Sequence, residues 1–229
     1  MVLFLGWKDQ QQIPFDQGWG WQPVSPTLWD VWPDEDLRKR GSVQDVNDMT
    51  EMSGTTGYIW GLDNQLHDTG LWQKKYRPVN HYVNGKIEPI GVKLYGANAY
   101  YQLCSFQEIV LLRFADVLLM GAELGSAKKQ EYMDMVRSRV KLPSIPVTLE
   151  NIKKERRFEL AFEGIRYYDL LRWGDVEKEV NKIKDIPIKN SNVPGTYSTK
   201  YRPETKGFLP SPNSQILLSN GVLTQNEGW

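Results

Sequence analysis

Residues 153–174, "KKERRFELAFEGIRYYDLLRWG", hold the densest mixture of acidic, basic and aromatic side chains in the chain. Glu155, Glu159 and Glu163 recur every four residues, so a helix would place their three carboxyl groups on one face. Glycoside hydrolysis uses two facing carboxyl groups, one of which acts as a general acid. The spacing of these glutamates therefore makes glycoside hydrolysis the first activity to consider.

Arginines in the same turns favour a structural role for these acids. A nearby guanidinium keeps a carboxylate ionised, whereas a general acid must keep its proton. Asp169 and Arg172, three residues apart, have the spacing of an ion pair within a helix. Charged side chains near a core normally survive there only when they are paired. We therefore expect no catalytic residue here but a structural ion-pair network of Glu155, Arg156, Glu159, Glu163, Arg166, Asp169 and Arg172.

Seven of the nine tryptophans precede residue 75, in segments rich in glycine, proline, aspartate and asparagine. Sugars present apolar C–H faces and a rim of hydroxyl groups, so a sugar-binding surface combines flat aromatic rings with polar side chains. The segments "FDQGWGWQ", "GYIWGLDN" and "GLWQ" carry both kinds of group. The ligand-binding residues that they predict are Asp16, Trp19, Trp21, Gln22, Tyr58, Trp60, Asn64 and Trp72. The alternative for each ring is burial in a loop-rich core, the role we assign to Trp173 and Trp229.

The sequence favours neither a metal nor a cofactor. His67 and His81 lack the spacing of zinc ligands, and "DNQLHD" lacks that of an EF-hand calcium loop. The chain contains no P-loop, dinucleotide-binding or Gly-x-Ser-x-Gly motif. With Cys104 as the single cysteine, an internal disulfide and a cysteine-based metal site are excluded.

Charge and hydropathy exclude other partners. The 229 residues include 28 acidic and 28 basic side chains, so no overall charge attracts nucleic acid or an anionic membrane. No apolar run reaches the roughly 18 residues of a membrane-spanning helix. The opening "MVLFLGW" is too short for the apolar part of a signal peptide. This abrupt start predicts that the chain is the later part of a longer protein.

The character of the sequence changes at residue 105. Before it, turn residues dominate; Asn84-Gly85 predicts a hairpin, and "SPTLWDVW", capped by Ser25 or Thr27, is the one helical segment. Ser105 and Glu108 form a capping box that opens a helical pattern as far as Gly125. A second helix is predicted over 130–142, a third from the cap Thr148 to Gly164 and a fourth over 165–174.

The first two of these helices have the combined length of one tetratricopeptide-type unit, about 34 residues. Such a unit depends on neighbouring helices to bury its faces. The predicted fold is therefore mainly α, with a tetratricopeptide-type helix pair and a few short strands. We divide it into a loop-rich ligand-binding region, 1–104, and a helical region with an extended tail, 105–229, which together form one compact unit.

The segment "ERRFELAFEGIRYYDLLRWG" closely resembles the C-terminal signature of the SusD/RagB family, the surface glycan-binding lipoproteins of Bacteroidetes nutrient-uptake systems. Further elements appear in the family's order: "LLRFADVLLMGAELG", "VRSRVKLP" and the ending "LPSPNSQILLSNGVLTQNEGW". The early "SPTLWDVWPDEDLRKR" is similar to the family's Asp-x-Arg segment, here Asp36 and Arg38. The chain departs from the family at "LPSP" and in length, because members are considerably longer and begin with a signal peptide, a lipidated cysteine and further helix pairs.

The resemblance implies a SusD-like fold and a non-enzymatic function. Such a protein captures oligosaccharide or polysaccharide at the cell surface and delivers it to a TonB-dependent outer-membrane transporter. The resemblance also implies an outer-membrane location, with attachment only through a lipid anchor on a preceding part of the protein. Two alternatives stay open: peptide capture by the same fold and, from another class, a glycoside hydrolase.

Overall fold

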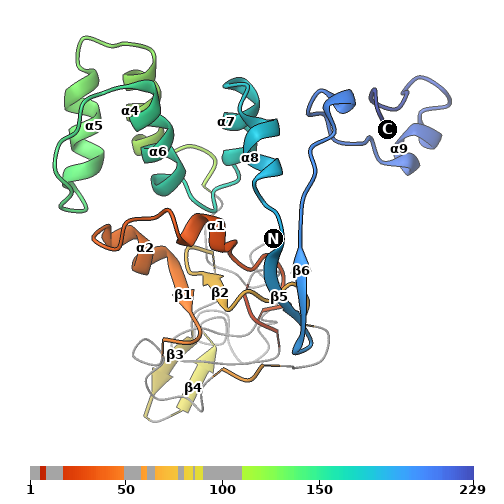
Figure 1. The fold of residues 1–229 in the computed structure, drawn as a ribbon, viewed down its shortest axis with the longest axis horizontal. Coiled ribbons are helices and arrows are strands. Elements are labelled where there is room, and N and C mark those ends of the chain that lie inside the picture. Colours follow the sequence, from red (N-terminus) through yellow and green to blue (C-terminus); the bar gives the residue numbers. More distant parts are fainter. Residues whose placement is uncertain are drawn as a thin grey trace. The chain divides into compact units, whose positions relative to one another are not determined.

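The computed structural model describes residues 6–8, 18–48, 58–60, 65–76, 80–84, 86–89 and 110–229 (Figure 1). The chain forms two compact units, one of residues 1–164 and 187–196 and the other of residues 165–186 and 197–229. This division does not follow the change in sequence character at residue 105, because the helix of residues 149–159 packs on the N-terminal segment and forms ion pairs to it. In the described part of the chain, no helix is long and apolar enough to cross a bilayer.

Two short capped helices begin the N-terminal segment. Helix α1, Pro26–Trp29, follows Ser25, one of the two predicted caps, whose hydroxyl oxygen accepts a hydrogen bond from the Thr27 amide (3.3 Å). Helix α2, Leu37–Ser42, was not predicted. Its cap is Asp36, whose carboxylate accepts a hydrogen bond from the Arg38 amide (3.0 Å), a favourable contact at a helix N-terminus. Asp36 therefore starts α2 and places Arg38 in its first turn.

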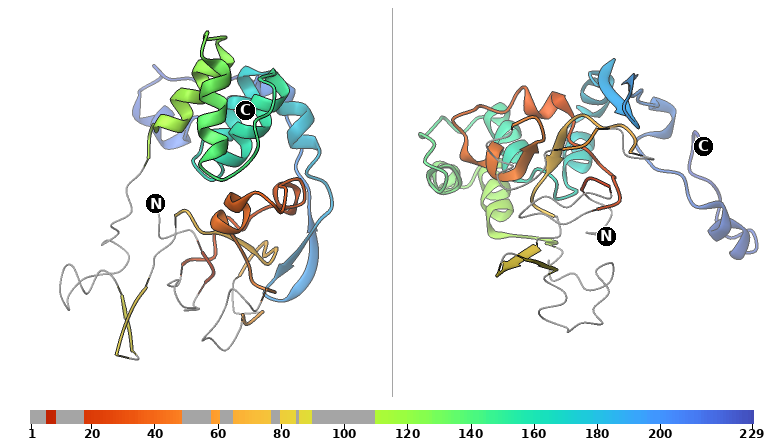
Figure 2. Two further views of the ribbon diagram at one scale, coloured as in Figure 1. Left: turned by 90° about the vertical axis from the view of Figure 1, so that its left-hand side faces the viewer. Right: turned by 90° about the horizontal axis from the view of Figure 1, so that it is seen from below.

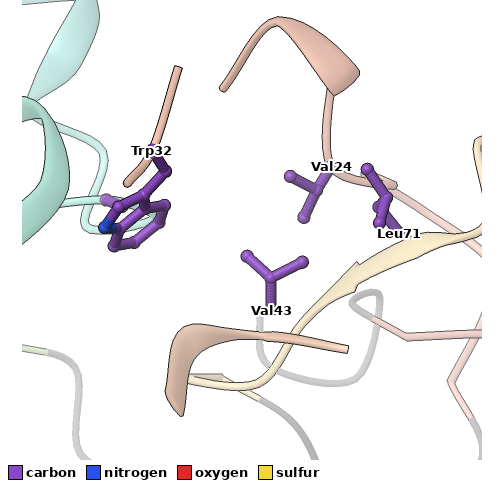
Figure 3. Packing of buried hydrophobic residues seen from close by; sticks show 5 residues of the cluster. Val24, Trp32, Val43 and Leu71 are labelled. Atoms are coloured by element: carbon purple, nitrogen blue, oxygen red, sulfur yellow. The ribbon is translucent and has the colours of Figure 1, made fainter. Parts of the chain in front are cut away.

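A two-stranded antiparallel sheet follows α2. Strand β1, Val43–Asp45, pairs with strand β2, Leu71–Gln73, so that Gln44 lies opposite Trp72. The side chains of Val24, Val43 and Leu71 gather beside Trp32 in one apolar cluster (Figure 3). The ring of Trp32 also stacks on Phe158 at 5.2 Å between ring centroids, which brings α6 onto this cluster.

The predicted hairpin at Asn84-Gly85 is confirmed. Strand β3, Asn80–Val83, and strand β4, Lys86–Pro89, pair in antiparallel register and lie side by side in Figure 2. Asn84 has a positive φ of 50°, as the first central position of a type I′ turn requires.

Three helices of the first unit pack together (Figures 1 and 2). They are α4, Phe114–Glu123, α5, Lys129–Ser138, and α6, Leu149–Glu159. Between α4 and α5 the buried side chains are Leu118, Leu119, Met133 and Val136. The predicted cap of the third helix is confirmed, because the Thr148 hydroxyl accepts a hydrogen bond from the Asn151 amide (3.2 Å).

Three predicted helix boundaries are wrong. Helix α4 begins at Phe114 rather than at 105: Arg113 has extended backbone angles, φ −135° and ψ 160°, while the predicted capping box lies outside the described residues. Helix α5 ends at Ser138, four residues before the predicted end. Helix α6 ends at Glu159 rather than at Gly164, and Phe162 has a φ of 68° that no helix continues through.

Sequence reasoning also read the last part of the first unit as loop. Strand β5, Ile186–Asn190, and strand β6, Val193–Tyr197, form a hairpin with Ser191 and Asn192 in the left-handed region. Pro187 in β5, and Pro194 with Gly195 in β6, hid the pattern of these strands.

The second unit contains helix α7, Arg166–Arg172, which confirms the predicted fourth helix. Helix α8, Val176–Asn181, the 3₁₀ helix η3, Pro203–Thr205, and helix α9, Asn213–Leu218, follow. Inside this unit the Tyr167 hydroxyl donates to the carbonyl oxygen of Gly207 (2.9 Å), which ties α7 to the tail.

Candidate functional site

Of the three glutamates that sequence reasoning selected, Glu155 and Glu159 lie on α6 and Glu163 follows its end. We use the name carboxylate cluster for Asp36, Glu155, Glu159 and Glu163. Glu155 and Glu159 are at most 2% exposed. The Arg38 guanidinium donates to Glu155 (2.6 Å) and to Glu159 (2.8 Å), and it also binds Asp36 through Nη2 (2.7 Å). A single arginine from α2 therefore holds three carboxylates together.

Further cations complete the carboxylate cluster. Arg113 donates to Glu159 (2.5 Å) and to Glu163 (2.8 Å). Arg139 donates to Glu159 (2.6 Å), Arg137 to Glu155 (2.7 Å) and Lys75 to Glu163 (2.9 Å). Every carboxylate of the cluster thus binds at least one cation.

The electrostatics of the carboxylate cluster favour ionised acids. Burial alone would raise the pKa of Glu159, but hydrogen bonds from Arg113 and Arg38, with the charges of Arg113 and Arg139, lower it below its ordinary value. Burial would also raise the pKa of Asp36. Hydrogen bonds from Arg38 outweigh this effect and lower the pKa. Burial alone would lower the pKa of Arg38, but its hydrogen bonds to Asp36, Glu155 and Glu159 raise it. Glu159 is therefore unsuited to hold the proton that a general acid needs.

The predicted ion-pair network is only partly reproduced. Asp169 and Arg172 form the predicted pair within α7 (2.9 Å). Arg156 pairs with Asp116 of α4 (2.7 Å), and Arg166 pairs with Glu179 of α8 (3.6 Å), two partners that were not predicted. Arg166, Asp169 and Arg172 belong to the second unit, so the continuous stretch 153–174 serves two units.

The loop of residues 18–22, which we term the indole loop, is held by main-chain contacts. The Gly18 amide donates to the Trp7 carbonyl (2.7 Å), and the Gly20 amide donates to the Gly6 carbonyl (2.8 Å). The side chain of Gln65 donates to the Gly20 carbonyl (3.1 Å) and accepts from the Lys8 amide (3.1 Å). Because the backbone is fixed at several points, the loop can hold exposed side chains in place.

The backbone angle and the close surroundings of residue 20 favour glycine. Its φ is +79°, and a Cβ atom built there would lie 2.6 Å from the Gln65 side-chain oxygen. A side chain at residue 20 would therefore both strain the backbone and displace Gln65.

The indole loop exposes two of the predicted rings. Trp19 is 41% exposed and Trp21 is 59% exposed, and Gln22, with a positive φ of 58°, is exposed beside them. An exposed indole offers a flat apolar face with a polar N–H group at its edge. Indole faces next to a glutamine amide are the chemistry that sugar binding requires.

The second group of rings, which we term the aromatic cluster, consists of Trp7, Tyr58, Trp60 and Trp72. Ring centroids lie 5.9 Å apart for Trp7 and Tyr58, 6.5 Å for Trp7 and Trp72, and 5.0 Å for Tyr58 and Trp60. Tyr58 and Trp60 are half-buried. Trp72 is 0% exposed, which corrects its prediction as a ligand-binding residue: its place in β2 turns the ring into the core.

Two residues that sequence reasoning missed lie against the aromatic cluster. The Lys189 ammonium nitrogen, from β5, lies 4.0 Å from the Trp60 ring centroid. The carboxyl group of Asp68, 3% exposed, accepts hydrogen bonds from the Tyr58 hydroxyl and from the Gly70 amide (2.9 Å). No local sequence pattern marks either one, because both contacts join segments far apart in the chain.

The remaining predicted residues have different outcomes. Asp16 and Asn64 lie outside the described residues. Trp173 is half-buried under the Arg172 guanidinium, 4.4 Å from the ring centroid. Trp229 is 48% exposed, and its indole N–H donates to the Phe208 carbonyl (2.9 Å). A search of the described residues finds no group of three or more His, Cys, Asp or Glu side chains that could hold a metal ion.

Comparison with known proteins identifies the fold. The sequence model of the SusD family matches residues 11–229. None of the curated proteins matches the chain. Among solved structures, surface glycan-binding protein A from Bacteroides thetaiotaomicron superposes with a TM-score of 0.72 at 23% identity, over 99% of this chain and 46% of its own.

Two further structures have higher identity. Surface glycan-binding protein A from Bacteroides fluxus is 26% identical, with a TM-score of 0.70, over 100% of this chain and 45% of its own. A protein described as a laminarin-binding SusD-like protein is 29% identical, with a TM-score of 0.68, over 100% of this chain and 44% of its own. This chain therefore spans less than half the length of the structures that it matches.

Proposed function

The chain belongs to the SusD family, and from this premise we propose that it captures an oligosaccharide or polysaccharide outside the bacterial cell without breaking it. The 29% identical relative is described as laminarin-binding, so we propose a glucan of the laminarin kind as the first ligand to test.

The observation that carries this proposal is the exposure of Trp19 and Trp21 on a loop with a fixed backbone. Sugar rings stack on exposed indole faces, and each such contact contributes on the order of 1 kcal/mol. A loop that is already ordered loses little conformational entropy on binding, so more of this contact energy becomes affinity. The amide of Gln22 supplies hydrogen-bonding groups for sugar hydroxyls beside the rings.

The state of the buried acids supports capture rather than hydrolysis. Glu155, Glu159 and Glu163 each bind arginine or lysine, and the pKa of Glu159 is lowered. A retaining or inverting glycosidase needs one carboxyl group that stays protonated until it meets the leaving group. We therefore propose that the protein is not an enzyme, and that its acids stabilise the first unit.

Family membership also supports a location and a partner. We propose that the whole protein lies at the outer surface of the cell and passes its ligand to a TonB-dependent outer-membrane transporter. Capture with moderate affinity suits this role, because a ligand that is to be handed on must also dissociate.

Calorimetric titration with product analysis tests the proposal. The full chain is titrated with laminarin, laminarihexaose, starch and a mixture of unstructured peptides, and the sugar samples are then assayed for reducing ends. We expect binding heat with at least one glucan and no new reducing ends. New reducing ends would favour hydrolysis, and heat with the peptides alone would favour peptide capture. Either result, or no heat with any sugar, would contradict glucan capture.

A further inference from the structure

The carboxyl group of Asp68 is buried with neutral donors, unlike the acids of the carboxylate cluster. It accepts from the Tyr58 hydroxyl and the Gly70 amide. Burial raises the pKa of Asp68, although the hydrogen bonds from Tyr58 and Gly70 and the charge of Lys189 oppose this effect. Burying an acid without direct charge pairing is costly. The position of Asp68 therefore calls for a reason other than stability.

The main chain of Asp68 is bonded to the residue that covers Trp60. The Asp68 amide donates to the Lys189 carbonyl (2.9 Å), and the Lys189 amide donates to the Asp68 carbonyl (2.8 Å). The ammonium group of Lys189 then lies over the Trp60 ring at 4.0 Å from its centroid. A cation at this distance is attracted to the negative face of the indole.

The side chain of Asp68 holds two other neighbours of Trp60. Tyr58, fixed by its hydroxyl, meets Trp60 edge to face, with ring planes at 85°. Gly70, fixed by its amide, lies so close that a Cβ atom there would be 3.0 Å from Cη2 of Trp60. Lys189 through its main chain, Tyr58 through its hydroxyl and Gly70 through its amide are thus each hydrogen-bonded to Asp68. The same three residues lie against Trp60.

We infer that Asp68 is a positioning residue for Trp60: it fixes Tyr58, Gly70 and Lys189 around the indole and so sets the ring surface left for a ligand. The consequence for ligand binding rests on the proposed function, whereas the fixed ring geometry does not. Since Lys189 covers part of one face of the indole, a sugar stacked on Trp60 must use the remaining surface or displace the ammonium.

The chemistry of the donors explains why this residue is an acid. A carboxyl group offers an acceptor oxygen to each of the two donors, Tyr58 O–H and Gly70 N–H. An asparagine could still accept from the Gly70 amide and donate to the Tyr58 hydroxyl oxygen, so it is a weak test of these contacts. Asp68→Leu has no polar atom in its side chain and loses both contacts.

Near-ultraviolet circular dichroism and titration with laminarihexaose test the inference on the full chain. We expect Asp68→Leu and Tyr58→Phe each to reduce the tryptophan bands of the spectrum. Each should also weaken laminarihexaose binding at least about 5-fold, equivalent to roughly 1 kcal/mol, the range of one lost hydrogen bond. The double variant should be no worse than Asp68→Leu, because that change already removes the contact with Tyr58. Asp134→Leu is the matched control and should leave both readouts unchanged, because Asp134 binds Gln130 and Ser144 in the first unit.

The two readouts separate this inference from the proposed function. If the unchanged protein does not bind laminarihexaose, glucan capture fails for this ligand, and the spectra still decide the role of Asp68. Tryptophan bands in Asp68→Leu that equal those of the unchanged protein would overturn the inference. Additive losses in the double variant would overturn it as well. Cooperative unfolding of each variant is the check that the fold persists.

Discussion

The first unit buries acids in two different ways. In the carboxylate cluster, Glu159 lies among guanidinium groups, and its pKa is lowered. In the aromatic cluster, Asp68 lies against a phenol and a backbone amide, and its pKa is raised. Burial acts in the same direction on both carboxyl groups, so the charge of the donors decides the outcome. We interpret the first arrangement as holding helix α6 to the N-terminal segment and the second as holding one ring in place.

The largest effect is expected from breaking the carboxylate cluster at Arg38. Arg38→Met leaves Asp36, Glu155 and Glu159 without a shared cation, and breaking a buried ion pair typically costs about 3–5 kcal/mol. Urea denaturation should show this loss in the free energy of unfolding. Arg40→Met is the matched control, because the Arg40–Asp48 pair is 48% and 25% exposed and should cost less than about 1 kcal/mol. Equal losses in the two variants would contradict the account.

Trp72 distinguishes a packing indole from a binding one. Trp72→Ala removes a fully buried ring and should destabilise the first unit by about 3–5 kcal/mol. Trp21→Ala removes a ring that is 59% exposed and should cost clearly less, on the order of 1 kcal/mol. Both values come from denaturant titrations. Similar destabilisation by the two substitutions would show that the exposed rings also serve the core.

Two glycines with the same backbone angle sharpen the description of the indole loop. Gly20 and Gly125 both have a φ of +79°, but a Cβ atom would meet Gln65 at 2.6 Å at the first and nothing within 4 Å at the second. Gly125→Ala should cost only the backbone strain, about 1 kcal/mol. Gly20→Ala should cost more and should weaken glucan binding, because the loop must shift. Thermal unfolding and titration measure the two effects, and equal costs would argue against the close contact with Gln65.

The two kinds of buried acid should change the free energy of unfolding in opposite directions as the pH falls. Asp36 and Glu159 have lowered pKa values, so their contribution is complete above the ordinary values of 3.8 and 4.5 and is lost as the pH falls through the folded-state values. For Asp68 the folded protein holds the proton more tightly. The unchanged protein should therefore gain stability relative to Asp68→Asn as the pH falls from neutral toward about 4. Urea denaturation between pH 7 and pH 3 measures both trends. If the unchanged protein instead loses stability relative to Asp68→Asn as the pH falls, the raised pKa of Asp68 is contradicted.

Local sequence signals predicted a large part of the fold. Ser25 and Thr148 were found as helix caps because a capping hydroxyl acts on amides only two or three residues away. The hairpin at Asn84 follows from the backbone angles of its turn. The end of α6 was misplaced because Gly164 looked like the stop, whereas the chain already leaves the helix at Leu160.

The candidate sites were less predictable, because their contacts join distant segments. Glu159 was recognised as a structural acid, but its partners Arg38, Arg113 and Arg139 lie 20 to 121 residues away. An arginine inside the apolar run "LLRFADVLL" was the one available signal for Arg113. Exposure was less predictable still: Trp21 and Trp72 sit in similar glycine-containing segments, and only strand pairing turns Trp72 inward.

The most direct test of the central claim compares tryptophans of similar exposure in the two units. The double variant Trp19→Ala/Trp21→Ala removes rings that are 41% and 59% exposed, and Trp229→Ala removes one that is 48% exposed. Titration with the best glucan of the panel should show binding at least about 10-fold weaker for the double variant, from roughly 1 kcal/mol lost per ring. Trp229→Ala should bind like the unchanged protein, and cooperative unfolding of the double variant is the check that its fold persists. Unchanged affinity in the double variant, or an equal loss in Trp229→Ala, would contradict the claim that the indole loop recognises the ligand.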